Sequence, residues 1–102
     1  MTLLDEIIQK GKEIFNQLRY TLPRLPYADA DYTRNLWILS MKRAIREVLR
    51  EHEPYANRYL LTTLSAKLSE CIMRLYQFPE MKSYYDSIIE DLYNMAKYGV
   101  EG

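Results

Sequence analysis

The amino-acid sequence predicts an all-α fold, a small bundle of four helices, and three observations support this prediction. Apolar residues recur every three or four positions along four separate stretches, which is the period of an amphipathic helix. The four prolines separate these stretches instead of interrupting them. The composition, 48% hydrophobic and 27% charged, is typical of a chain that buries a core. Because 102 residues fall within the usual size of one domain, we expect a single helical domain over residues 1–102.

The first expected helix starts at the N-terminus and ends at the segment 23–26, where two prolines remove amide donors and restrict the residues before them. Thr2 followed by Asp5 resembles a capping box, with Asp in place of the usual Glu or Gln. Gly11 lies on the apolar face of this helix, where glycine costs about 1 kcal/mol relative to alanine. A close crossing with the backbone of another helix would explain this glycine.

The next two helices are bounded by capping residues and by proline. The second expected helix begins at Asp29 or Asp31, both candidate N-caps, and runs to about Glu51. The third runs from about Pro54 to Tyr76, with an apolar stripe along one face.

The fourth expected helix begins at Pro79, which suits a first helical turn, and Gly99 is its candidate C-terminal cap. Short connections favour antiparallel neighbours, so an up-and-down bundle is the simplest packing. A three-helix core with a swapped or dimer-forming fourth helix is the main alternative. The residues predicted to hold the core are Trp37, Leu64, Leu68, Ile88 and Leu92.

Charge and cysteine content restrict the compartment and the partners. Lys plus Arg and Asp plus Glu both count 14, so no global charge drives binding to nucleic acid or to an anionic membrane. The single cysteine, Cys71, cannot form an intramolecular disulfide, and its place on an apolar helix face predicts a buried thiol. No apolar run approaches the roughly 18 residues of a membrane span, and acids stand where a secretory signal has basic residues. We expect a cytoplasmic protein that does not bind membranes.

The sequence contains no arrangement of residues that predicts catalysis. One histidine and one cysteine are too few for a zinc site, and Leu49 stands where a di-metal bundle would place Glu three positions before His52. The serines lie in helical stretches without a nucleophile elbow, and no glycine-rich phosphate loop is present. We predict a chain that is not an enzyme and holds no metal or cofactor.

Arg46 and His52 form an Arg-x5-His pattern within a small helical protein, and this spacing resembles the active site of HEPN-type ribonucleases. The resemblance covers only this segment. It implies that the two side chains face a dimer cleft and cleave RNA. Glu47 follows the arginine, where that family commonly has a small polar residue.

Tyrosine is the most unusual feature of the composition, with ten residues in so short a chain. Amphipathic aromatic side chains are enriched at protein interfaces because they bury a large area at modest entropic cost. The predicted contact residues are Tyr84, Tyr85, Tyr93 and Tyr98. We therefore predict a protein–protein interaction module, such as an adaptor, assembly factor or small regulatory subunit, that forms a homodimer or docks onto a larger protein.

The second expected helix has a basic face, and the alternative function rests on it. Its members are Lys42, Arg43, Arg46 and Arg50. Such a face would bind phosphates with a strong salt dependence, as in a nucleic-acid-binding accessory protein. The favoured interpretation is a solvated surface, or pairing against the acidic fourth helix within the bundle or across a dimer.

Overall fold

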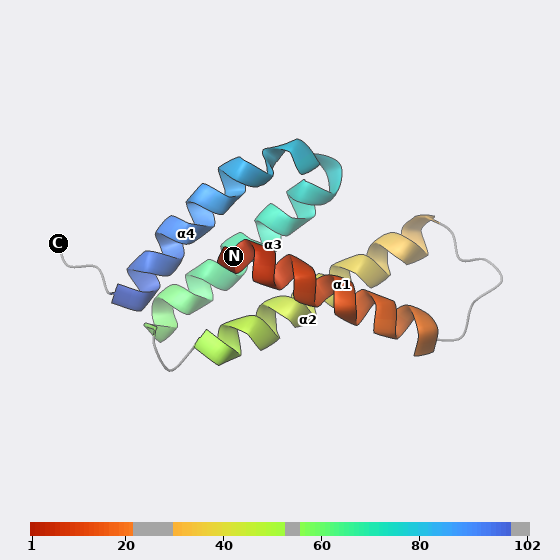
Figure 1. Cartoon of the computed structure of the whole chain (residues 1–102), viewed down its shortest axis with the longest axis horizontal. Coiled ribbons are helices and arrows are strands. Elements are labelled where there is room, and N and C mark those ends of the chain that lie inside the picture. The colour runs from red at the N-terminus through yellow and green to blue at the C-terminus, as the bar shows by residue number, and fades with distance from the viewer. Residues whose placement is uncertain (22–29, 53–55, 99–102) are drawn as a thin grey trace.

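The computed structural model of the chain describes residues 1–21, 30–52 and 56–98. The helices in these ranges are α1 (Leu3–Thr21), α2 (Ala30–His52), α3 (Arg58–Gln77), the short 3-10 helix η2 (Pro79–Met81) and α4 (Lys82–Tyr98). Successive α-helices reverse direction (Figure 1), and no strand occurs in the described part of the chain. The prediction of an all-α antiparallel bundle is confirmed.

All four α-helices contribute to one apolar core. The largest side chains that are fully buried include Leu4, Ile7, Met41, Leu64, Leu68 and Ile89. Two predicted core residues, Leu64 and Leu68, are among them. Trp37, Ile88 and Leu92 pack against this core but remain partly exposed. The core therefore lies where the periodicity predicts it, and three of the expected members lie at its edge.

The bundle is elongated because its two hairpins are offset. Figure 1 shows the α1–α2 hairpin extending along the long axis beyond the turn that joins α3 to α4. The molecule measures 55 × 28 × 21 Å, and its radius of gyration is 14.9 Å. A compact chain of this length would have a radius of about 13 Å. The offset leaves long stretches of helix surface without a neighbouring helix of this chain.

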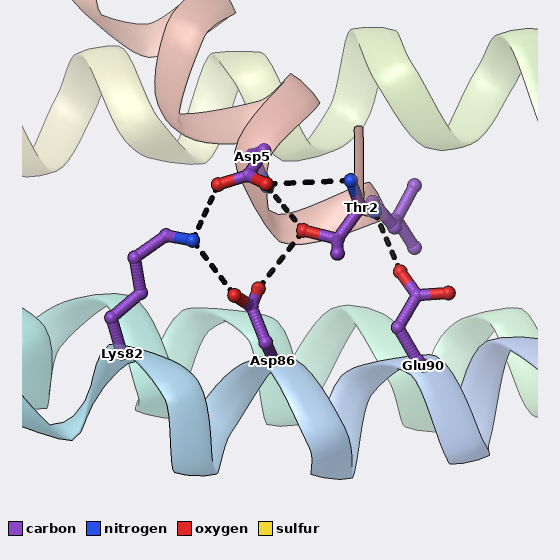
Figure 2. A network of polar contacts seen from close by, with 6 residues as sticks. Thr2, Asp5, Lys82, Asp86 and Glu90 are labelled. Atoms are coloured by element: carbon purple, nitrogen blue, oxygen red, sulfur yellow. Dashed lines mark hydrogen bonds and ion pairs between the residues drawn. The ribbon is translucent and has the colours of Figure 1, made fainter.

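The first turn of α1 is capped as the sequence predicts. The amide of Asp5 donates to the Thr2 hydroxyl at 3.1 Å, and the amide of Thr2 donates to the Asp5 carboxylate at 3.4 Å. Lys82 of α4 forms an ion pair with the same carboxylate, 2.5 Å from Nζ to Oδ1 (Figure 2). The capping box is confirmed, and it has a partner on another helix.

Two further hydrogen bonds join the start of α1 to the middle of α4 (Figure 2). The Thr2 hydroxyl donates to Asp86 Oδ1 at 2.9 Å, and the amide of Leu3 donates to Glu90 Oε1 at 2.8 Å. Glu90 thus binds a backbone donor that a helix N-terminus leaves without an intrahelical partner, and Asp86 binds the hydroxyl of the capping residue. These contacts hold the first helix against the last.

Gly11 has a close neighbour on α2, but this neighbour is a side chain and not the helix backbone that was expected. A Cβ atom at this position would lie 2.8 Å from Cε of Met41 and closer still to its sulfur. Met41 is 1% exposed, so its side chain fills the space that the missing Cβ leaves.

The helix starts differ from the prediction at two points. Helix α3 begins at Arg58, not near Pro54, because the Asn57 side chain caps it: Oδ1 accepts from the amides of Tyr59 at 2.9 Å and Leu60 at 3.3 Å. Pro79 starts the helix η2, and α4 follows from Lys82.

Asp31 is not the N-cap of α2, because this helix begins at Ala30 and includes Asp31. The other predicted boundary residues, Pro23, Pro26, Asp29, Pro54 and Gly99, lie outside the described residues.

Candidate interaction surfaces

The four tyrosines predicted to form an interface do not share one surface. Tyr84 is 59% exposed and Tyr98 is 72% exposed, both on α4. The Tyr84 ring lies 5.6 Å from that of Tyr85, and Lys97 Nζ lies 5.5 Å from the centroid of the Tyr98 ring. Tyr84 and Tyr98 are therefore available to a partner.

Tyr85 belongs to the core, which corrects its expected place at the surface. It is 6% exposed and packs in the cluster that contains Leu64 and Ile89. The hydrogen bond between the Tyr85 hydroxyl and Arg74 is the main reason that the pKa of Arg74 is raised, followed by the charge of Glu70. Helical phase explains the difference from Tyr84, since neighbours along a helix point about 100° apart.

Tyr93 is half-buried and bonded within the chain. Its hydroxyl lies 2.8 Å from Nδ1 of His52, and the two rings meet edge to face at 5.3 Å. His52 Nε2 lies 3.6 Å from the Glu6 carboxylate. The three side chains connect α1, α2 and α4, so Tyr93 and His52 serve the packing of the bundle.

A stripe of partly exposed apolar side chains follows the outer face of α4. We define the α4 stripe as Tyr84, Ile88, Met95 and Tyr98. With Asp91, these residues alternate steps of four and three, which is the spacing of helices that pair side by side. The sequence predicts Ile88 as a core residue and does not predict Met95 as a contact residue. The alternation of steps of four and three is the signal that would have revealed the stripe.

A groove between α3 and α4 borders this stripe. It has a volume of about 580 Å³ and mostly apolar walls. Its lining residues are Thr63, Ala66, Lys67, Glu70, Ile88, Asp91 and Leu92. Ile88 belongs to both features, so the stripe and the groove form one continuous surface.

A second and larger groove lies between α2 and α3, and we call it the α2–α3 groove. Its volume is about 750 Å³. Its polar lining residues are Lys42, Arg46, Arg50, Arg58, Thr62, Ser65 and Ser69, and its apolar ones are Ile45, Leu49, Leu61 and Ala66. No acid lines it. Sequence analysis found three of the four cations but missed Arg58 and the hydroxyls, because they come from the other helix.

Arg43 lies apart from the other members of the predicted basic face. It is exposed on α2 but does not line the α2–α3 groove. The structure therefore divides the predicted set Lys42, Arg43, Arg46 and Arg50 into three groove residues and one residue outside the groove.

The Arg-x5-His pair lies against different helices. Arg46 lines the groove beside α3, whereas His52 contacts Glu6 of α1 and Tyr93 of α4. Within this chain the two side chains do not converge on one cleft. Glu47, the residue after the arginine, forms an ion pair with Lys10 at 3.7 Å.

The other candidate chemical groups are placed as follows. Cys71 is 1% exposed, and burial raises the pKa of its thiol, as expected of the predicted core cysteine. Over 1–21, 30–52 and 56–98, no three His, Cys, Asp or Glu side chains group as metal ligands. Within the same ranges, no helix combines the length and apolarity of a membrane span.

Comparison with known proteins adds no relative to these observations. No family model matches the chain, and no curated protein or solved structure gives a significant match.

Proposed function

We propose that this chain is a helical protein–protein interaction module without catalytic activity, and that it self-associates through the α4 stripe. The observation that carries this proposal is the unpaired row of apolar side chains on α4, where Tyr84, Met95 and Tyr98 are 59%, 46% and 72% exposed. Single exposed apolar residues are common on monomers, but here they gather along one side of α4 with Asp91 among them, and a cluster of exposed apolar side chains is typical of an interaction site.

The spacing of the row favours a second helix as its occupant. Residues at steps of four and three lie along one side of an α-helix and interlock with the same row on a partner helix. From Tyr84 to Tyr98 the row spans about 21 Å at 1.5 Å per residue. The neighbouring α3–α4 groove provides an apolar recess for side chains of the partner.

A second copy of the chain fits the charges at this groove. Lys67 and Asp91 both line it, from α3 and α4 respectively. Glu70 also lines the groove and forms an ion pair with Lys67 within the chain. In a two-fold symmetric dimer each contact occurs twice, so Asp91 of either copy can add to this pair by contacting Lys67 of the other. The rim therefore offers charges of both signs to an identical partner.

Light scattering coupled to size-exclusion chromatography tests the proposal at several protein concentrations. We expect the wild-type chain to form a dimer that persists in high salt, because its interface is mainly apolar. Tyr84→Ser and Met95→Ser should each raise the dissociation constant about tenfold, since truncation of a central interface residue costs roughly 1–2 kcal/mol. Both residues are exposed, so the variants should keep the helical content of the wild type.

Tyr20→Ser is the matched control. Tyr20 is 83% exposed near the end of α1, on the part of the α1–α2 hairpin that extends away from α4 (Figure 1). Its removal should leave the dissociation constant unchanged. A wild-type chain that stays monomeric at all concentrations, or an equal loss in the control, would contradict self-association through α4.

We also propose a cytoplasmic location. Cys71 is the one cysteine of the chain, and its thiol is free and buried. A chain without a disulfide is typical of reducing compartments.

A further inference from the structure

We propose that the α2–α3 groove is a binding site for the phosphate backbone of a nucleic acid. This site is separate from the α4 stripe and does not depend on self-association. Its four cations come from both walls, Lys42, Arg46 and Arg50 from α2 and Arg58 from α3, and none of the described residues that line it is an acid.

The cations on α2 are free to bind a ligand. Lys42, Arg46 and Arg50 are all exposed, and none takes part in an ion pair within the described part of the chain. Two acids close to the lining residues have other partners: Glu47 pairs with Lys10, and Glu70 pairs with Lys67 and Arg74. Within the described part of the chain, no ion pair therefore neutralises the three charges on α2.

The arrangement of the cations favours a linear polyanion over a compact one. Lys42, Arg46 and Arg50 follow one another at intervals of four residues, so they form a row about 12 Å long. Along the axis of B-form DNA, this length corresponds to about three or four phosphates of one strand. A single small phosphate would engage only one or two of these side chains.

The opposite wall supplies groups that suit the same ligand. Thr62, Ser65 and Ser69 line the groove from α3, and hydroxyls are common donors to phosphate oxygens. Thr62 already donates to the Arg58 carbonyl at 3.1 Å. The two serine hydroxyls remain the better candidates for donation.

The apolar residues of the groove indicate how specific the site is. Ile45, Leu49, Leu61 and Ala66 line it together with the cations, and no aromatic side chain of residues 1–21, 30–52 and 56–98 does. Sequence-independent readers of bases use aromatic stacking platforms. We therefore infer that the groove recognises the sugar–phosphate backbone and not the identity of the bases.

Fluorescence anisotropy with labelled oligothymidine, and with a mixed-sequence duplex, tests this site in the full chain. We expect binding at low salt, with a slope of log K against log salt of about −2 to −3 for the single strand, as three to four phosphate contacts require. Arg46→Gln and Arg50→Gln should each weaken binding about fivefold at roughly 0.1 M salt and reduce the magnitude of the slope by about 0.7. Binding of either nucleic acid with these properties supports the proposal.

Arg43→Gln is the matched control, because it removes the same charge from the same helix outside the groove. It should leave affinity and slope nearly unchanged. The proposal is wrong if neither probe binds at low salt, or if Arg43→Gln weakens binding as much as Arg46→Gln. It is also wrong if poly-glutamate or phosphatidylserine vesicles occupy the groove as well as the oligonucleotide does. The oligomeric state of the charge variants, measured in parallel, reports on the α4 stripe independently.

Discussion

At the scale of single residues, Gly11 shows how much a sequence reveals about packing. A glycine on an apolar helical face predicts a close neighbour, and the α1–α2 crossing confirms it. The identity of that neighbour was not predictable. Met41 reaches Gly11 only because of the angle and offset at which α2 crosses α1, and these depend on packing throughout the bundle.

The Gly11–Met41 contact predicts that Gly11→Ala changes the free energy of unfolding in opposite directions in the wild-type chain and in a Met41→Val variant. Gly11→Ala gains about 1 kcal/mol of helix propensity, but it forces a fully buried Met41 to move, and overpacking costs about 1–3 kcal/mol. We expect the variant to lower the free energy of unfolding by about 1 kcal/mol in urea denaturation.

Met41→Val removes the sulfur and Cε that the new Cβ would meet, and it provides the control background. There, Gly11→Ala should raise the free energy of unfolding by up to about 1 kcal/mol. Stabilisation by Gly11→Ala in both backgrounds would show that Met41 does not restrict this position.

At the scale of helices, the existence of each element was predictable and its first turn often was not. The periodicity of apolar residues predicted all four helices. It did not identify Asn57 as the N-cap of α3, because Pro54 gave a more obvious signal for the boundary of that helix. The position of Asn57 is also fixed from outside α3. Its amide donates to the Ala96 carbonyl at 2.7 Å, which joins the start of α3 to the end of α4.

Removal of the Asn57 cap should destabilise α3 from its first turn. Asn57→Ala leaves the amides of Tyr59 and Leu60 without their acceptor, so we expect a loss of about 1 kcal/mol in the free energy of unfolding. Amide hydrogen exchange at these two residues should accelerate more than elsewhere in α3.

Asn57→Asp keeps a side-chain acceptor at the same position, so it should retain most of the stability. Equal stability of Asn57→Ala and the wild type would mean that the cap does not contribute. Slower exchange at Tyr59 and Leu60 in Asn57→Ala would contradict the assignment directly.

The α4 residues show where sequence analysis of the site reached its limit. Tyr84 and Tyr85 are neighbours on one helix and so point to different faces, but composition alone could not decide which one is buried. The choice depends on the rotation of α4 against α1 and α3, and that rotation buries Tyr85, Ile89 and Ala96. Ile88 and Leu92 consequently lie at the edge of the core, next to the α3–α4 groove.

At the scale of the whole molecule, the offset of the two hairpins is the feature that sequence did not reveal. Short connections predict antiparallel neighbours, but they do not determine how far one hairpin slides along the other. Specific polar contacts accompany the offset. The start of α1 forms hydrogen bonds with Asp86 and Glu90 in the middle of α4. Both acids belong to the acidic fourth helix, and both bind the first helix.

The network around Lys82 (Figure 2) makes the stability of this joint depend on pH. The hydrogen bond with Lys82 is the main cause that lowers the pKa of Asp5, with Thr2 contributing next. Contacts with Asp5 and then with Asp86 raise the pKa of Lys82. The stabilisation from Asp5 is therefore present above its ordinary pKa of 3.8 and is lost as the pH falls through the lowered value. The stabilisation from Lys82 is present below its ordinary pKa of 10.5 and is lost as the pH rises through the raised value.

Lys82→Met should therefore reduce the free energy of unfolding by a nearly constant amount between about pH 4 and pH 10, and by less below that range, where Asp5 becomes protonated. We expect a deficit below about 1 kcal/mol, because the Lys82 and Asp5 side chains are 40% and 35% exposed. Urea denaturation over this pH range measures the deficit, with Lys12→Met, an exposed lysine of α1, as the control. A deficit that persists unchanged in strong acid, or that equals the effect of Lys12→Met, would show that the ion pairs do not stabilise the contact between α1 and α4.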